Sequence, residues 1–129
     1  MGQQQLLLII LGLIMVGVAI AVGSSLFGSW SVSSNKDSLV NDLQNLGADA
    51  YQFRSRPANL GGGGGTYAGY VVPIRLRAND NGTFTPTTPV ATPQTITFIA
   101  TSATYNGTIT AKLDSTGHLG DFIYTDEFL

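Results

Sequence analysis

The chain begins with a long apolar run. Residues 6–22 (LLLIILGLIMVGVAIAV) contain no polar side chain, and residues 23–30 continue the run with small and aromatic ones. A helix from Gln5 to Trp30 would span roughly 39 Å, enough to cross a bilayer core of about 30 Å. A secretory signal has a shorter apolar region that follows a basic segment, whereas an uncharged glutamine segment precedes this run. The run therefore predicts a transmembrane helix, or a helix that is buried among copies of itself.

Glycines punctuate the apolar run and allow two interpretations. They stand at Gly2, Gly12, Gly17, Gly23 and Gly28. Each costs about 1 kcal/mol relative to alanine in a water-exposed helix, but glycine lets the backbones of packed helices approach each other. The glycines are either those of an ordinary membrane helix or the mark of a closely packed stretch that partly unwinds within residues 17–25.

An amphipathic pattern follows from Ser38 onward. Apolar side chains recur at spacings of four and three, at Leu39, Leu43, Leu46, Ala50 and Phe53, with polar residues between them. This pattern predicts a helix whose apolar stripe packs on a sheet. Residues 34–37 offer a separate helix start, but we favour one continuous helix with a weak point at residues 31–35. Pro57 prevents simple continuation of the helix.

A run of five glycines, residues 61–65, follows the predicted helix. A phosphate-binding loop is disfavoured, because no Lys-Ser or Lys-Thr pair follows the run and no strand precedes it. We expect a flexible or closely packed connector between helix and sheet. Five residues without side chains could also lie flat against a neighbouring molecule.

The rest of the chain has the composition of β-strands, rich in Thr, Val, Ile, Phe and Tyr with turn residues between. The predicted strands cover residues 67–77, a short segment from Phe84, and residues 95–101, 108–113 and 118–124. Turns are expected at residues 79–82, 106–107 and 114–117, and a surface loop at residues 85–93. Pro73 indicates an edge position or a bulge in the first strand.

Together these patterns predict an α+β fold. A long N-terminal helix, apolar and then amphipathic, packs its C-terminal half on a small antiparallel sheet of four to five strands. About 70 residues of sheet make a marginal core alone, so the amphipathic helix supplies the second layer. The expected parts are an apolar helix (1–35), an amphipathic helix (36–57), a glycine-rich connector (58–66) and a β domain (67–129).

The distribution of charged residues supports this division of the chain. The six Lys/Arg and eight Asp/Glu residues make up 11% of the chain, and none lies before Lys36. Average soluble domains contain about 25% charged residues. The net charge of -2 argues against a nucleic-acid partner. The chain has no cysteine, which excludes disulfides, thiolate catalysis and cysteine-bound metal centres.

Candidate chemistry is sparse. His118 is the only histidine and has no predictable partner, so we expect a surface residue. The acids near Asp80 and Asp126 lack the spacing of a calcium-binding EF-hand loop. No enzyme activity, metal or cofactor is predicted. Asn81 and Asn106 begin N-x-Thr sequences on predicted turns and are candidate glycan acceptors if the chain is exported.

An apolar helix, an amphipathic continuation, a loop and an antiparallel sheet are the plan of a type IV pilin-like subunit, which this chain resembles along its length. Mature subunits of that family often begin with Met or Phe, and Met1 fits this pattern. The family usually has Glu at the fifth residue to pair with a terminal amine, whereas this chain has Gln5, which cannot form an ion pair. Either Met1 follows a removed leader, or it is the initiator of an uncleaved start. Met1 and Gln5 are the candidate residues for registration between subunits.

The resemblance implies a subunit that waits in the cytoplasmic membrane and is assembled by pilus machinery into an extracellular filament with copies of itself. The helices would form the filament core and the sheet would lie outside. The core residues implied are Leu6, Leu7, Leu8, Ile9, Ile10, Leu11, Leu13, Ile14, Val16, Val18, Ile20, Val22, Leu26 and Phe27. Two alternatives are a binding module with a single membrane span and a virion coat protein.

Overall fold

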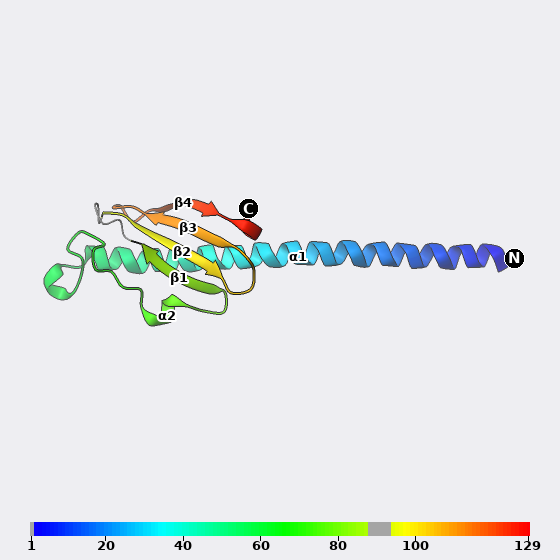
Figure 1. Ribbon diagram of the computed structural model, residues 1–129, viewed down its shortest axis with the longest axis horizontal. Helices are drawn as coiled ribbons and strands as arrows, with labels where there is room; N and C mark the ends of the chain where they lie inside the picture. The colour runs from blue at the N-terminus through cyan, green and yellow to red at the C-terminus, as the bar shows by residue number, and fades with distance from the viewer. Residues whose placement is uncertain (1, 88–93) are drawn as a thin grey trace. The chain divides into compact units, whose positions relative to one another are not determined.

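The structure is a computed structural model that describes residues 2–87 and 94–129. Its helices are α1 (Gly2–Ser55) and α2 (Ile74–Arg77), with short 3₁₀ helices η1 (Ala58–Leu60) and η2 (Asp126–Phe128). Its strands are β1 (Gly82–Thr87), β2 (Ile96–Ser102), β3 (Thr108–Leu113) and β4 (Leu119–Tyr124) (Figure 1). The chain divides into two compact units, Met1–Ser33 and Ser34–Leu129.

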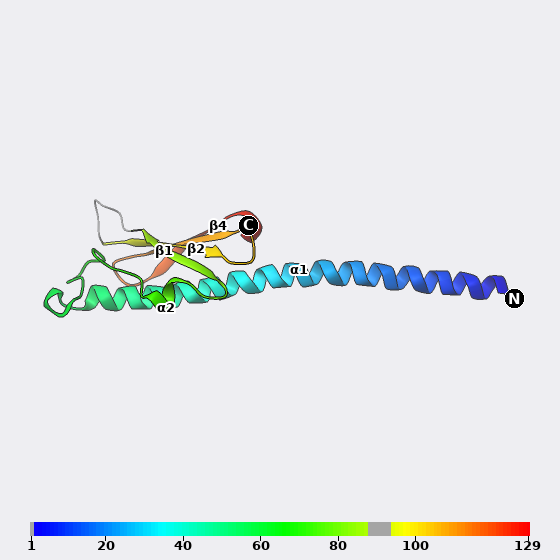
Figure 2. The same ribbon diagram turned by 60° about the horizontal axis from the view of Figure 1, so that its bottom comes forward.

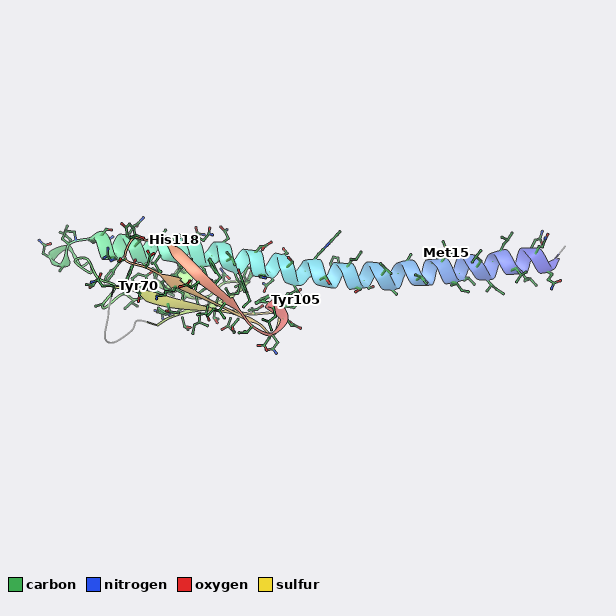
Figure 3. The ribbon with its side chains drawn as sticks, turned by 90° about the horizontal axis from the view of Figure 1, so that it is seen from above. Met15, Tyr70, Tyr105 and His118 are labelled. Atoms are coloured by element: carbon green, nitrogen blue, oxygen red, sulfur yellow. The ribbon has the colours of Figure 1, made fainter. Side chains whose placement is uncertain are left out.

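The first unit is the N-terminal part of α1. The helix is unbroken from Gly2 to Ser55, so the prediction of one continuous helix is confirmed and a separate start at residues 34–37 is not. It is also helical throughout residues 17–25, where partial unwinding was one of the two interpretations of the glycines. Side chains project from both visible edges of this part of α1, as around Met15 in Figure 3.

The second unit is a helix packed on an antiparallel sheet, in the order β1-β2-β3-β4. Residues 34–55 of α1 lie along one face of the sheet (Figure 2). The helix contributes Leu39, Leu43, Leu46, Gly47 and Ala50 to the core, and the sheet contributes Phe84, Ile96, Phe98, Ala100, Ile109, Ala111 and Leu113. The α+β architecture expected from the sequence is confirmed, with four strands.

Four of the five residues of the predicted helix stripe are buried. Leu39, Leu43 and Ala50 are completely buried, and Leu46 is nearly so. Phe53 is only half-buried, and its ring lies 5.4 Å from that of Tyr70. Phe53 lies in the last turn of α1, and its ring packs against Tyr70 on the segment that follows the glycine run.

The prediction of a strand at residues 67–77 is wrong. The N–H of Tyr70 donates to the carbonyl of Tyr67 in a turn, and Gly69 has a φ of 81°, which an extended strand does not allow. Pro73 has no N–H to give to a sheet and begins the single-turn helix α2 instead, since its carbonyl accepts from Leu76. Tyr67, Tyr70 and Val72 are still buried, so the apolar pattern reflects core packing without strand pairing.

The other strands are confirmed with small shifts of their ends. The predicted segments at residues 95–101, 108–113 and 118–124 correspond to β2, β3 and β4, and the segment from Phe84 is β1, which begins earlier, at Gly82. The turn at residues 79–82 is closed by the side-chain oxygen of Asn79, which accepts from the N–H groups of Asn81 and Gly82 at 2.9 and 3.1 Å. Residues 88–93 of the predicted surface loop lie outside the described residues.

The pairing between β3 and β4 contains a β-bulge. Thr110 pairs with Ile123, whereas Lys112 pairs with Gly120, so β4 has one extra residue in this interval. Asp121 lies in the interval with a φ of 54°, in the left-handed region. A residue in this conformation is typical of bulges that bend and twist a strand. The edge strand of the sheet is therefore not straight.

The glycine run closes the C-terminal end of α1. The N–H groups of Gly63, Gly64 and Gly65 donate to the carbonyls of Phe53, Arg56 and Arg54 at 2.8, 3.0 and 2.8 Å. The last carbonyls of a helix have no partner within the helix. These bonds satisfy two carbonyls in the last turn of α1 and that of Arg56, which directly follows the helix. Of the two expected kinds of connector, the structure therefore shows the closely packed one.

Candidate assembly surface

The apolar surface of the first unit is defined here as the large apolar side chains of residues 6–27. All fourteen predicted core residues belong to it, and their exposed fractions range from 50% at Leu26 to 73% at Phe27. Met15 is exposed in the same way at 66%, although the prediction did not include it. In the isolated chain none of this surface is buried, and α1 is long and apolar enough to cross a membrane.

The apolar surface covers every side of its helix. A helix that packs on one neighbour needs a single apolar stripe, whereas a helix that is apolar all round is buried within protein or lipid. Burial of one large side chain contributes on the order of 2 kcal/mol. Among the described residues, the first unit has no second layer of its own, so its apolar surface is uncovered in the single chain.

No other part of the described chain packs closely against Gly12, Gly17, Gly23 or Gly28. A Cβ atom added at Gly12, Gly17, Gly23 or Gly28 would meet no atom within 4 Å. Each glycine nevertheless costs the helix about 1 kcal/mol relative to alanine. Gly12 and Gly23 lie about three turns apart and so on one side of the helix, and the same spacing relates Gly17 to Gly28. Close contact with other helices is a physical reason for glycine at such positions.

The predicted registration residues are only partly described. Met1 lies outside the described residues, and Gln5 is an exposed residue of α1. The structure contains one copy of the chain, so registration between subunits stays a prediction.

Polar contacts fix α1 where it enters the second unit. The side-chain oxygen of Asn35 accepts from the Ser102 hydroxyl at 2.7 Å, and its amide donates to the carbonyl of Asn81 at 3.4 Å. The ammonium group of Lys36 lies 4.0 Å from the centre of the Tyr124 ring, in a cation–π contact. The first charged residue of the chain is thus already held against the sheet.

A second contact joins α1 to the turn before β1. One carboxylate oxygen of Asp42 accepts from the side-chain amides of Asn79 and Asn81 at 2.9 and 3.0 Å. The turn was predicted from the sequence, but its contact with α1 was not. The sequence contains the two asparagines of the turn and an acid on the polar side of the helix, but no local pattern indicates that they meet.

The two candidate glycan acceptors differ in their surroundings. The amide nitrogen of Asn81, to which a glycan would be attached, donates to Asp42. Asn106 is exposed in the turn between β2 and β3, and its backbone N–H donates to the Glu127 carboxylate at 2.9 Å. The hydroxyl of Thr108, the third residue of this sequence, lies 2.6 Å from that of Thr125. Glycosylation stays a prediction, and Asn106 is the more accessible acceptor.

His118 is exposed, as expected for a surface histidine (Figure 3). It lines a shallow hollow of about 340 Å³ together with Gln44, Gly47 and Leu119. Within residues 2–87 and 94–129, no group of three or more His, Asp or Glu side chains could hold a metal ion.

Tyr70 has the most perturbed acid–base equilibrium of the second unit. Burial and a 2.6 Å hydrogen bond from its hydroxyl to Asp49 raise the pKa of Tyr70 far above its ordinary value of 10.0. The folded state therefore favours the protonated phenol, and this contribution to stability is complete below pH 10 and is lost as the pH rises beyond it.

We expect the free energy of unfolding to fall as the pH is raised above 10, and to fall less steeply in Tyr70→Phe. The variant lacks the titrating hydroxyl, although at neutral pH it should lose about 1 kcal/mol with the hydrogen bond. Urea unfolding at several pH values between 8 and about 11.5 measures both effects. Equal slopes in the two proteins above pH 10 would contradict the assignment to Tyr70.

Comparison with protein-family models, with curated proteins and with solved structures found no match to this chain.

Proposed function

We propose that this protein is a structural subunit that assembles with copies of itself into an extracellular helical filament of the type IV pilus kind. The observation that carries the proposal is the contrast between the two units. The first exposes large apolar side chains at 50% or more over residues 6–27, whereas the second buries a complete core of its own.

Helix packing between copies would cover the apolar surface. Relative to water, burial of each large side chain contributes about 2 kcal/mol, whereas relative to lipid the helices gain from close packing around their glycines. Because the surface covers all sides of the helix, each copy can contact several neighbours in a head-to-tail manner. Contacts of this kind that do not close into a ring produce an open helical polymer.

The proposed life cycle has two stages. Before assembly the apolar helix lies in the cytoplasmic membrane, for which α1 is a candidate span. Assembly machinery of the pilus kind then transfers it from lipid to the filament. The stretch without an ionisable side chain continues to Asn35, which is longer than one membrane crossing needs and suits a helix packed in a polymer.

An anchored binding module is the second candidate, and the same span favours it. Such a protein would stay in washed membranes and dissolve in detergent as a monomer or small oligomer. Electron microscopy of material sheared from cells that produce the chain, followed by mass spectrometry of any filaments, separates the two. Filaments built of this chain are expected, whereas their absence with all of the protein in the membrane would favour the module.

We expect Leu8→Asp and Ile10→Asp to abolish filament formation. A carboxylate packed between helices without a partner costs several kcal/mol per copy, or must be neutralised. Both side chains are exposed in the single chain, at 68% and 53%, so neither substitution disturbs the fold of the subunit. Filament yield is measured by electron microscopy and by sedimentation of sheared material.

Asn41→Asp is the matched control for these substitutions. It places the same charge on the same helix, at an exposed position on the polar side of residues 34–55. The control should form filaments at the yield of the unchanged protein. If Leu8→Asp also formed filaments normally, residues near Leu8 would not lie in the core.

A further inference from the structure

The apolar surface thins out towards its C-terminal side, where small residues and one tryptophan take over. Leu26 and Phe27 are its last large side chains, and the next four residues are Gly28, Ser29, Trp30 and Ser31. At the N-terminal side the surface begins directly after the segment Gln3–Gln4–Gln5. Uncharged hydrogen-bonding groups therefore border the apolar surface at both ends, with no ionisable side chain at either border.

The length between these borders matches one bilayer. The helix rises by about 1.5 Å per residue, so residues 6–27 span about 32 Å, compared with about 30 Å for a hydrocarbon core. The whole uncharged stretch to Asn35 is longer by about 12 Å. Because no charged residue lies close to either border, charge does not fix the position of the helix along the membrane normal. Another feature must set its depth.

Trp30 has the properties of a depth-setting residue. It is the only tryptophan of the chain, and 71% of its side chain is exposed in the structure. Its indole combines a large apolar body with one N–H donor, and tryptophan is enriched where the hydrocarbon meets the lipid headgroups. Trp30 lies about one turn beyond Phe27, at the level that a bilayer filled by residues 6–27 would give to its headgroup layer.

We propose that Trp30 fixes the depth of the apolar helix in the bilayer, with residues 6–27 in the hydrocarbon and the indole among the headgroups. This inference rests on the membrane stage of the proposed function and adds its register. Residues 31–35 lie in this register on the water side of the boundary, although they carry no charge. In the proposed filament, residues 31–35 would be an uncharged part of the helix that lipid had not covered before assembly.

Depth-dependent fluorescence quenching tests the register. The full chain is placed in phosphatidylcholine vesicles whose acyl chains carry bromine either near the carbonyl end or near the terminal methyl. We expect Trp30 emission to be quenched at least about twofold more strongly by the shallow bromine than by the deep one. The lone tryptophan makes the signal unambiguous.

A matched control moves the fluorophore to the bilayer centre. The double variant Trp30→Phe, Met15→Trp keeps one tryptophan and places it near the middle of residues 6–27, at an exposed position of α1 (Figure 3). This variant should show the opposite order, with stronger quenching by the deep bromine. It also demonstrates that the vesicles contain inserted helices.

Deep or absent quenching of Trp30, with the control behaving as expected, overturns the register. Filament formation by the same protein is assayed separately. Filaments together with a deeply placed Trp30 would contradict the register and leave the proposed function intact. A shallow Trp30 in a chain that never forms filaments in its host would support the register and contradict the function.

Discussion

A chain that lacks residues 1–33 is expected to be a soluble, folded monomer that neither enters membranes nor forms filaments. The second unit, Ser34–Leu129, is compact by itself and contains every residue of the buried core. The cut removes the whole apolar surface and keeps Asn35 and Lys36, with their contacts to Ser102 and Tyr124. Size-exclusion chromatography with light scattering, circular dichroism and electron microscopy measure mass, folding and assembly.

The full chain in detergent is the control for this truncation. Both proteins should show the same cooperative unfolding of the second unit, because no core residue is lost. Fibres formed by the fragment would show that the apolar helix is not the filament core. An unfolded fragment would instead show that the second unit needs the N-terminal helix, against the division seen in the structure.

Gly63→Ala is expected to destabilise the second unit by at least about 2 kcal/mol. A Cβ atom at Gly63 would overlap the carbonyl oxygen of Thr66 and press on the Phe53 ring, so the loop would have to open. Opening removes the bonds from the glycine run to the carbonyls at the end of α1. Urea unfolding of the 34–129 fragment measures the change from its midpoint and slope.

Gly120→Ala serves as the matched control for Gly63→Ala. Its Cβ would meet only the far end of the exposed His118 side chain, at 3.3 Å, which can turn away. We therefore expect a change of less than about 1 kcal/mol in the same assay. A similarly small effect at Gly63 would mean that the glycine run is a loose tether rather than a cap for the helix.

Where local pattern and tertiary packing agreed, the sequence predicted the fold well. The stripe from Leu39 to Ala50 and the alternation in β2 and β3 each describe a face that one neighbour covers, and these elements were identified almost to the residue. Residues 67–77 show the same alternation, yet Gly69 and Pro73 prevent pairing there. An alternating apolar pattern indicates which side chains are buried. Whether the segment also pairs as a strand depends on backbone conformation and on the N–H groups available.

The residues of the apolar surface could be predicted from the sequence, because they form a nearly unbroken apolar run. No folding partner within the chain competes for residues 6–27, so the run of apolar letters already defines the surface. The contacts of Asn35 were not predictable. Its partners Asn81 and Ser102 lie 46 and 67 residues away, and no local pattern marks an amide that will find them.

The bulge at Asp121 has a consequence for the filament proposed above. β4 is an edge strand, and a straight edge with free N–H and C=O groups is a template for a strand of the next molecule. A kink with an exposed carboxylate in its middle interrupts that template, because the neighbour would need a matching extra residue and would meet a charge. In the filament proposed above, this edge of the sheet would thereby resist strand pairing between crowded subunits, and contact between copies would be left to the helices.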